Sequence, residues 1–200
     1  MEVTLSPADR ALLAVPEHGL FYDATRNSRM YVAASLTGGI ALLVPATTGN
    51  HPTLFNPLGS GRVLSIRKLR LAYVSGANAP GTLAWGATVD AGADIGPTGA
   101  AILTATRVAV RNAAGGAGVD SKAYWAPAVC TFTAAPTVHR HIGLSQLTGV
   151  AATAVAPFEL GEDYDGDNLI MPGAALSLCA EAATTTSLYR VTILFEEVDE

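Results

Sequence analysis

The sequence predicts an all-β protein: a jelly-roll-like antiparallel β-sandwich with one short N-terminal helix. Apolar runs with a period of two recur along the 200 residues, and turn residues separate them at intervals of roughly 8 to 20 residues. No repeat of fixed period accompanies them, which argues against a propeller or a solenoid. We expect an N-terminal arm over residues 1–18 and a single sandwich domain over residues 19–200.

The arm carries the predicted helix. Ser6 is a typical N-cap residue, Pro7 follows at the first helical position, and Asp9 lies in the first turn. Pro16 ends the pattern. A helix of about two turns is not stable alone, so we expect it to dock on the sandwich or on a neighbouring subunit.

A long strand is predicted between the corner at residues 56–61 and the turn at Ser75-Gly76. Its apolar residues form two sets of opposite parity: Leu64 and Ile66, then Leu69, Leu71 and Tyr73. A β-bulge at Arg67-Lys68 adds one residue and brings both sets to the same side. We therefore expect a bulged strand in the middle of the sandwich.

The remaining strands are predicted from shorter alternating runs. Residues 40–44 are expected to pair as a hairpin with residues 30–36, and residues 45–57 are expected to form a loop. The other predicted strands are 82–90, 102–111, 128–133, 138–144, 174–180 and 187–198.

The composition indicates a protein that assembles. The chain is 50% hydrophobic and 14% charged, whereas a soluble domain has about 25% charged residues. Few charges would have to be desolvated at repeated contacts, so we predict a homo-oligomer and favour a trimer. The Ala-rich, Arg-over-Lys bias can also arise from genome composition alone, and that alternative stays open.

The charge distribution predicts an interface rather than a nucleic-acid site. A net charge of −5 gives no reason to expect nucleic-acid binding. We predict that the basic cluster contacts an acidic neighbour, such as the late acidic segment of the next copy. The basic cluster consists of Arg62, Arg67, Lys68 and Arg70.

The first residues do not have the pattern of a signal peptide, and the longest apolar stretch, near residues 39–45, is too short to span a bilayer. We expect a soluble protein made without a secretory leader. Cys130 and Cys179 lie in apolar runs and are predicted to be buried free thiols, with an interstrand disulfide as the alternative.

Two groups of residues could bind a metal. His139 and His141 would share one face of a strand, but we expect them to face solvent or an interface, because no third ligand is identifiable. Asp163, Asp165 and Asp167 have calcium-like spacing. Glycine and glutamate are missing at the sixth and twelfth positions of the helix-loop-helix calcium site. We predict no metal, and these aspartates are weak candidates.

Two further groups could support catalysis or sugar binding. His18, His51 and Asp23 could belong to a hydrolase triad, but the chain has no G-x-S-x-G elbow. Tyr124-Trp125, with Trp85 as a second ring, could form a sugar-binding platform, although tryptophans in a β-sandwich are more often core residues. No P-loop or dinucleotide fingerprint is present. We predict a non-enzymatic protein without catalytic residues or a cofactor.

Two stretches carry a family resemblance. The first is Asn56-Pro57-Leu58-Gly59-Ser60-Gly61 with the β-run that follows it. The second is Met171-Pro172-Gly173, followed by a strand, a Thr-rich turn and a last strand that closes on residues 195–198. Both resemble segments of poorly characterised structural proteins of tailed bacteriophages and prophages. The acidic loop at residues 162–167 departs from that pattern.

The resemblance implies a β-sandwich component of the virion, held in place many times over and made in the host cytoplasm. We therefore expect a capsid decoration or head/tail accessory protein that acts by multivalent assembly. Its partners would be further copies of itself and other virion proteins, with neither nucleic acid nor membrane among them. The alternative is a carbohydrate-binding β-sandwich module that uses Tyr124 and Trp125 on an exposed loop. A third possibility is a β-domain stabilised by a metal in the acidic loop.

Overall fold

A computed structural model describes residues 21–35, 38–76, 82–88, 111–115, 120–132, 134–144, 159–181 and 187–200. Within these ranges the chain forms one short helix, α2 (Tyr22–Arg26), which is too short to cross a membrane. The strands are β1 (Met30–Ala34), β2 (Thr48–Asn50), β3 (Thr53–Phe55), β4 (Arg62–Ser75), β5 (Thr82–Thr88), β6 (Arg111–Asn112), β7 (Tyr124–Ala126), β8 (Val129–Thr131), β9 (Thr137–Leu144), β10 (Glu159–Asp163), β11 (Leu169–Ile170), β12 (Ala175–Ala180) and β13 (Leu188–Asp199).

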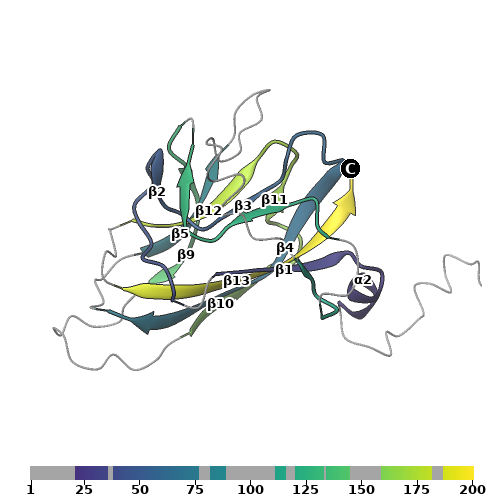
Figure 1. Ribbon diagram of the computed structural model, residues 1–200, viewed down its shortest axis with the longest axis horizontal. Helices are drawn as coiled ribbons and strands as arrows, with labels where there is room; N and C mark the ends of the chain where they lie inside the picture. Colours follow the sequence, from purple (N-terminus) through teal and green to yellow (C-terminus); the bar gives the residue numbers. More distant parts are fainter. Residues whose placement is uncertain are drawn as a thin grey trace, which may run out of the picture.

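The strands form two stacked antiparallel sheets and a small third one. Sheet I has the order β10-β4-β13-β1-β6, with β11 also paired to β4. Sheet II has the order β7-β3-β12-β5-β9, and sheet III consists of β2 and β8. Figure 1 shows sheet I as the lower layer and sheet II above it, with α2 beside the start of β1. The predicted all-β sandwich is confirmed.

The pairing of the principal strands is nested along the chain. β1 pairs with β13, β3 with β12, β4 with β10 and β5 with β9, all antiparallel. The first principal strand thus pairs with the last, and each later strand pairs one step further inward. Successive principal strands alternate between the two sheets up to β5 and β9, which pair with each other in sheet II. The first and last principal strands, β1 and β13, lie side by side in sheet I.

The core lies between the facing surfaces of sheets I and II. Its side chains come from alternate positions of the strands, as expected for a sandwich. The largest fully buried ones include Trp85 of β5, Trp125 of β7, and Tyr189 and Phe195 of β13. The alternation predicted for the last strand is confirmed, because Tyr189, Val191, Ile193 and Phe195 are each 1% exposed or less.

The predicted bulge in the long strand is confirmed. Along β13, Leu194 lies opposite Lys68 and Phe195 lies opposite Ile66, which leaves Arg67 as an extra residue in β4. As a result Leu64, Ile66, Leu69 and Leu71 are all fully buried in the same core. β4 is an inner strand of sheet I, between β13 on one side and β10 with β11 on the other.

Two local predictions near the start of the sandwich are wrong. Residues 40–44 do not form a hairpin with β1: Ile40 makes an isolated bridge to Tyr189 of β13, and the next four residues are not in a strand. After β1 the chain continues along β13 instead of turning back. The long strand β13 extends beyond β1, so its backbone N–H and C=O groups remain available to pair with Ile40. The loop predicted at residues 45–57 contains β2 and β3. The helix predicted within the arm and most of the strand at residues 102–111 lie outside the described ranges.

Candidate binding sites on the basic strand and at the end of the sandwich

The basic cluster lies on β4, and each of its members pairs with a carboxylate of the same chain. Arg62 pairs with Asp199. The other contacts are Arg67 to Glu196 at 2.6 Å, Lys68 to Asp163 at 3.9 Å, and Arg70 to Asp163 at 2.8 Å. The late acidic residues therefore do pair with the basic strand, but within the same chain. A contact of the same residues with another copy stays a prediction.

Arg70 fastens the edge strand β10 to the sheet. Its Nη1 donates to the carbonyl oxygen of Glu162 at 3.1 Å, and its Nη2 donates to Oδ1 of Asp163 at 2.8 Å. The side chain lies flat across Gly161, where an added Cβ would come within 2.8 Å of Arg70 Nη1. Glycine at this position thus makes room for the arginine.

Arg67 occupies the bulge and holds a largely buried carboxylate. The side chain of Glu196 is 9% exposed and also contacts Arg29 at 3.2 Å. The carbonyl oxygen of Arg67 accepts a hydrogen bond from the Tyr164 N–H at 2.8 Å, so the bulge also anchors the loop after β10. Sequence parity located this bulge, but it gave no sign of its partner Glu196.

The acidic loop does not form a metal site in the described part of the chain. Asp163 is bound by Arg70, and Asp167 accepts a hydrogen bond from Arg140 at 2.7 Å. This arginine lowers the pKa of the Asp167 carboxyl. Asp165 is exposed, and no three His, Cys, Asp or Glu side chains are grouped among the described residues. Two of the three weak calcium candidates, Asp163 and Asp167, are thus held in separate ion pairs.

A polar chain links the edges of the two sheets beside this loop. The buried Trp85 Nε1–H donates to Tyr164 Oη at 2.6 Å, and that hydroxyl donates to Glu162. Burial and the hydrogen bond to Glu162 raise the pKa of Tyr164, so its phenol stays protonated. Arg140 of β9 lies over the Tyr164 ring, 5.0 Å from its centroid. These contacts join β5 and β9 of sheet II to the β10 edge of sheet I.

The prediction of an aromatic platform on an exposed loop is wrong. Trp125 lies in β7, is 1% exposed and donates its Nε1–H to the Ala34 carbonyl oxygen at 2.8 Å. Trp85 is fully buried. Neither ring can stack on a sugar, because a core position removes both faces from solvent.

The histidines also differ from one another. His139 and His141 on β9 are exposed as predicted, and His141 lies 3.4 Å from Glu181. His51 is fully buried, and burial lowers the pKa of its imidazole. Its Nδ1 lies 3.7 Å from the Cys179 sulfur. His18 lies outside the described ranges.

The two cysteines are buried free thiols, as predicted. Burial raises the pKa of Cys130 to about 11 and that of Cys179 to about 12. Cys130 of β8 accompanies Phe132 in a small second core, and the Phe132 ring lies 6.3 Å from that of His51. These contacts place sheet III over the outer face of sheet II, a cover that the sequence did not reveal.

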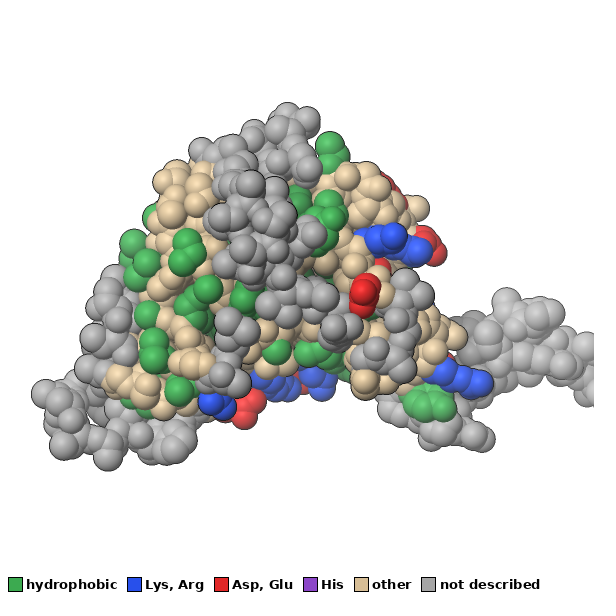
Figure 2. Space-filling model, in the orientation of Figure 1, with side chains coloured by type: hydrophobic (Ala, Val, Ile, Leu, Met, Phe, Trp, Pro, Cys, Tyr) green, Lys and Arg blue, Asp and Glu red, His purple; other side chains and the backbone are tan. Residues whose placement is uncertain are grey.

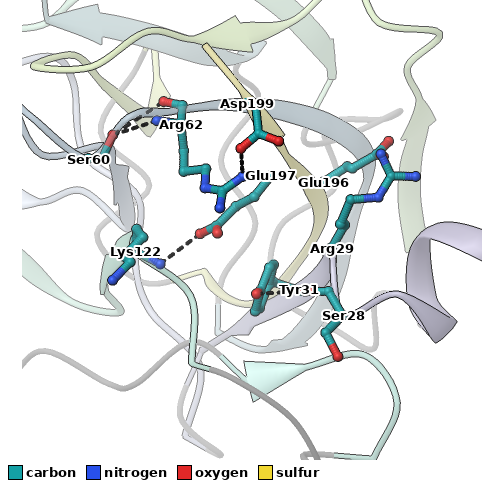
Figure 3. Close-up of polar contacts among 9 residues, drawn as sticks. All are labelled: Ser28, Arg29, Tyr31, Ser60, Arg62, Lys122, Glu196, Glu197 and Asp199. Carbon is teal, nitrogen blue, oxygen red and sulfur yellow. Dashed lines mark hydrogen bonds and ion pairs between the residues drawn. The ribbon is translucent and has the colours of Figure 1, made fainter.

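A pocket of about 220 Å³ opens at the end of the sandwich. It lies where β4 begins, β13 ends and β1 begins, and the segment before β7 forms another wall. Figure 3 shows six of the lining residues, which come from separate segments of the chain: Ser28, Arg29, Tyr31, Arg62, Lys122 and Glu197. The lining residues are Asn27, Ser28, Arg29, Tyr31, Arg62, Asp120, Lys122 and Glu197. Arg62 belongs to the predicted cluster, whereas no sequence motif indicated the others.

Comparisons with known proteins found no matching family model, no matching curated protein and no matching solved structure.

Proposed function

We propose that the protein is a non-enzymatic structural component of a bacteriophage particle, a capsid decoration or head/tail accessory protein that acts by multivalent assembly. The observation that carries this proposal is a joint between the two stretches of the family resemblance. The Asn56 N–H donates to the Ala174 carbonyl at 3.0 Å, and the Gly173 N–H donates to the Asn56 carbonyl at 2.8 Å. Segments more than 100 residues apart thus form one structural unit.

The side chain of Asn56 explains why the motif has this form. It is fully buried, and its Nδ2 donates to the carbonyl oxygens of Arg62 at 2.7 Å and Ile170 at 2.9 Å. Its Oδ1 accepts from Ser60 Oγ at 2.7 Å. Gly59 and Gly61 have φ values of 76° and 65°, a region that favours glycine. The resemblance therefore rests on a specific joint, which supports common architecture more strongly than loose turn composition would.

The nested strand pairing supports a jelly-roll topology. A jelly roll wraps one antiparallel ribbon in which the first strand pairs with the eighth, the second with the seventh, and so on inward. The pairs β1–β13, β3–β12, β4–β10 and β5–β9 follow this order. Jelly rolls occur in viral capsid and lectin domains. Fold alone does not decide function, but the buried tryptophans weaken the lectin alternative.

An apolar patch on the outer face of sheet I is a suitable contact for another copy. Val63 lies opposite Val198 on β13, and Leu169 of β11 lies opposite Ser65 on the same face of β4. Leu169 and Met171 are each 49% exposed and Val198 is 38% exposed. We call this set, Val63, Leu169, Met171 and Val198, the outer apolar patch.

The margins of this patch carry both signs of charge. Arg62 pairs with Asp199 at one margin, and Arg67 pairs with Glu196 at the other. A surface of a neighbouring copy can match charges of both signs, and a polar rim around an apolar centre is the usual anatomy of an interface. Figure 2 shows that charges gather beneath and at the end of the molecule, whereas the face over β2, β5 and β9 carries scattered apolar side chains.

Light scattering on the purified protein at micromolar concentration tests the assembly. We expect an oligomer, with a trimer favoured. Val198→Lys should weaken the association by about 10-fold or more, because it places a charge in the apolar centre. Val138→Lys on β9 is the matched control, since Val138 is 39% exposed and lies in the other sheet.

A monomer at all concentrations, or equal effects of the two substitutions, would contradict the proposed assembly surface. Mass spectrometry of purified particles then tests the location. Detection of the chain in many copies per particle supports a structural role in the virion, and its absence from particles would exclude one.

A further inference from the structure

The pocket at the end of the sandwich contains a carboxylate that is fixed in place. Glu197 is 6% exposed, and its Oε1 accepts hydrogen bonds from the Lys122 N–H at 2.7 Å, the Ala123 N–H at 3.4 Å and the Ser121 hydroxyl. These donors all come from the segment before β7. The carboxylate is therefore held against one wall, where its second oxygen can accept a hydrogen bond from a ligand.

The phenol of Tyr31 forms the inner wall. Its hydroxyl donates to the carbonyl oxygen of Ser28 at 2.7 Å, and its ring stacks on Phe195 with the centroids 5.8 Å apart. Ser28 has a φ of 56°, which is uncommon for a residue with a side chain. Such backbone geometry is energetically unfavourable and is frequent at ligand sites. The wall beside Tyr31 is thus built at an energetic cost.

Three cationic side chains and two carboxylates line the same pocket, and one of the cations, Arg29, is already bound by Glu196 at 3.2 Å. Lys122 is exposed, and its ammonium forms no ion pair with any residue in the described ranges. Arg62 pairs with Asp199, whose side chain is 86% exposed. An exposed pair of this kind contributes little to stability, so another anion can take the place of Asp199.

We propose that this pocket binds a small hydroxylated anion. Arg62 and Lys122 hold its carboxylate or phosphate group, and the hydroxyl donates to Glu197. In Figure 3 the Arg62 and Lys122 side chains lie on either side of the Glu197 carboxylate, which fits a ligand that carries both groups. The volume is below the roughly 300–1,000 Å³ of pockets for drug-sized ligands, so the ligand is compact. This binding goes beyond the proposed role in assembly and does not depend on it.

Calorimetric titration of the full chain with citrate tests the site, with tricarballylate, the same tricarboxylate without the hydroxyl, and glycerol as comparison ligands. We expect citrate to bind with a dissociation constant of about 1 mM or lower. Tricarballylate should bind about 5-fold more weakly because it leaves Glu197 without a donor. Glycerol, which has hydroxyls but no anionic group, should not bind measurably.

Matched variants separate the site from general electrostatics. Lys122→Gln should weaken citrate binding by about 5- to 10-fold, whereas Asp199→Asn should strengthen it by about 2- to 5-fold because the competing internal anion is removed. Lys68→Gln and Asp165→Asn change the net charge by the same amounts outside the pocket and should leave binding unchanged.

The proposal is overturned by any of three results: no citrate binding up to about 10 mM, equal effects of the pocket variants and their controls, or weaker binding by Asp199→Asn. Circular dichroism of each variant shows whether the fold is kept. The Lys122 side chain has no ion-pair partner among the described residues, so its substitution isolates the ligand contact.

Discussion

The outer faces of the two sheets differ sharply in what covers them. On sheet I, Lys68 and Arg70 project from β4 and meet Asp163 at the exposed surface. On sheet II, the corresponding positions carry small side chains: Ala84 and Gly86 on β5, with Ser177 and Cys179 on β12, all buried. Pro136 lies over Gly86, and His51, whose ring lies 6.3 Å from that of Phe132, lies over Cys179.

This difference shows when a period-two alternation of apolar and polar residues indicates the buried positions of a strand. It does so only when the other face of the strand is exposed to solvent. β4 alternates visibly because water contacts its outer side, whereas all six residues of β12 are buried. A strand between two layers needs small outward side chains, and their size rather than their polarity marks the second layer. The same substitution should therefore have different effects on the two sheets.

The largest contrast is expected from a pair of glycine substitutions. At Gly86 an added Cβ would lie 2.8 Å from Pro136 Cβ and 3.1 Å from Cys179 Sγ. Gly86→Ala should lower the free energy of unfolding by about 1–3 kcal/mol, because the packed layer cannot move aside. At Gly161 the added Cβ meets only the flexible end of Arg70. Gly161→Ala should cost less than about 1 kcal/mol.

Urea unfolding of both variants measures this contrast. Equal losses of stability would mean that the layer over Gly86 moves aside as easily as an exposed side chain, and its description as a packed layer would then be wrong.

A pH effect of intermediate size is expected from His51 under this cover. Burial lowers the pKa of His51 from 6.5 in the folded protein, so the unfolded chain takes up this proton first as the pH falls. The contribution of His51 to stability is therefore constant above about pH 6.5 and decreases as the pH falls from there toward the lowered pKa.

Denaturation midpoints between pH 7.5 and 5.5 measure this dependence. His51→Gln should flatten it, whereas His141→Gln on the exposed side of β9 should leave it unchanged. A pH dependence that disappears in His141→Gln and persists in His51→Gln would contradict the assignment of this effect to His51.

The smallest effect is expected on the charged face. Arg70→Gln removes the hydrogen bonds to Asp163 and to the Glu162 carbonyl, and the arginine side chain is 38% exposed. We expect a loss of no more than about 1 kcal/mol. Unfolding in about 0.5 M salt should reduce the difference from the wild type, because screening weakens exposed pairs. A loss that persists in salt would indicate that Arg70 acts through packing over Gly161.

Much of the fold followed from local patterns. The parity break between Ile66 and Leu69 located the bulge, and the alternation along residues 189–195 identified the last strand. Both patterns are visible because each of these strands has one solvent-exposed face. The short strands β2 and β3 were missed since they contain only three residues each and lie among turn residues. Ile40 was predicted to pair with residues 30–36 because a Gly-Gly pair normally indicates a hairpin. In the structure it pairs with Tyr189 of β13 instead.

The candidate sites were harder to predict. The basic cluster was found from composition, but its partners Glu196 and Asp199 depend on the register between β4 and β13. The end pocket could not be predicted at all, since Arg62, Lys122 and Glu197 meet only after three segments converge.

The sequence by itself determined the period-two strands, the bulge at Arg67 and the turn chemistry of Asn56 to Gly61, because each depends on residues that are close along the chain. The tertiary structure alone decided which strands pair, that a further layer covers sheet II, and that the basic strand pairs with carboxylates of the same chain. These features depend on contacts between residues far apart in the chain, and no local pattern records the register that brings such residues together.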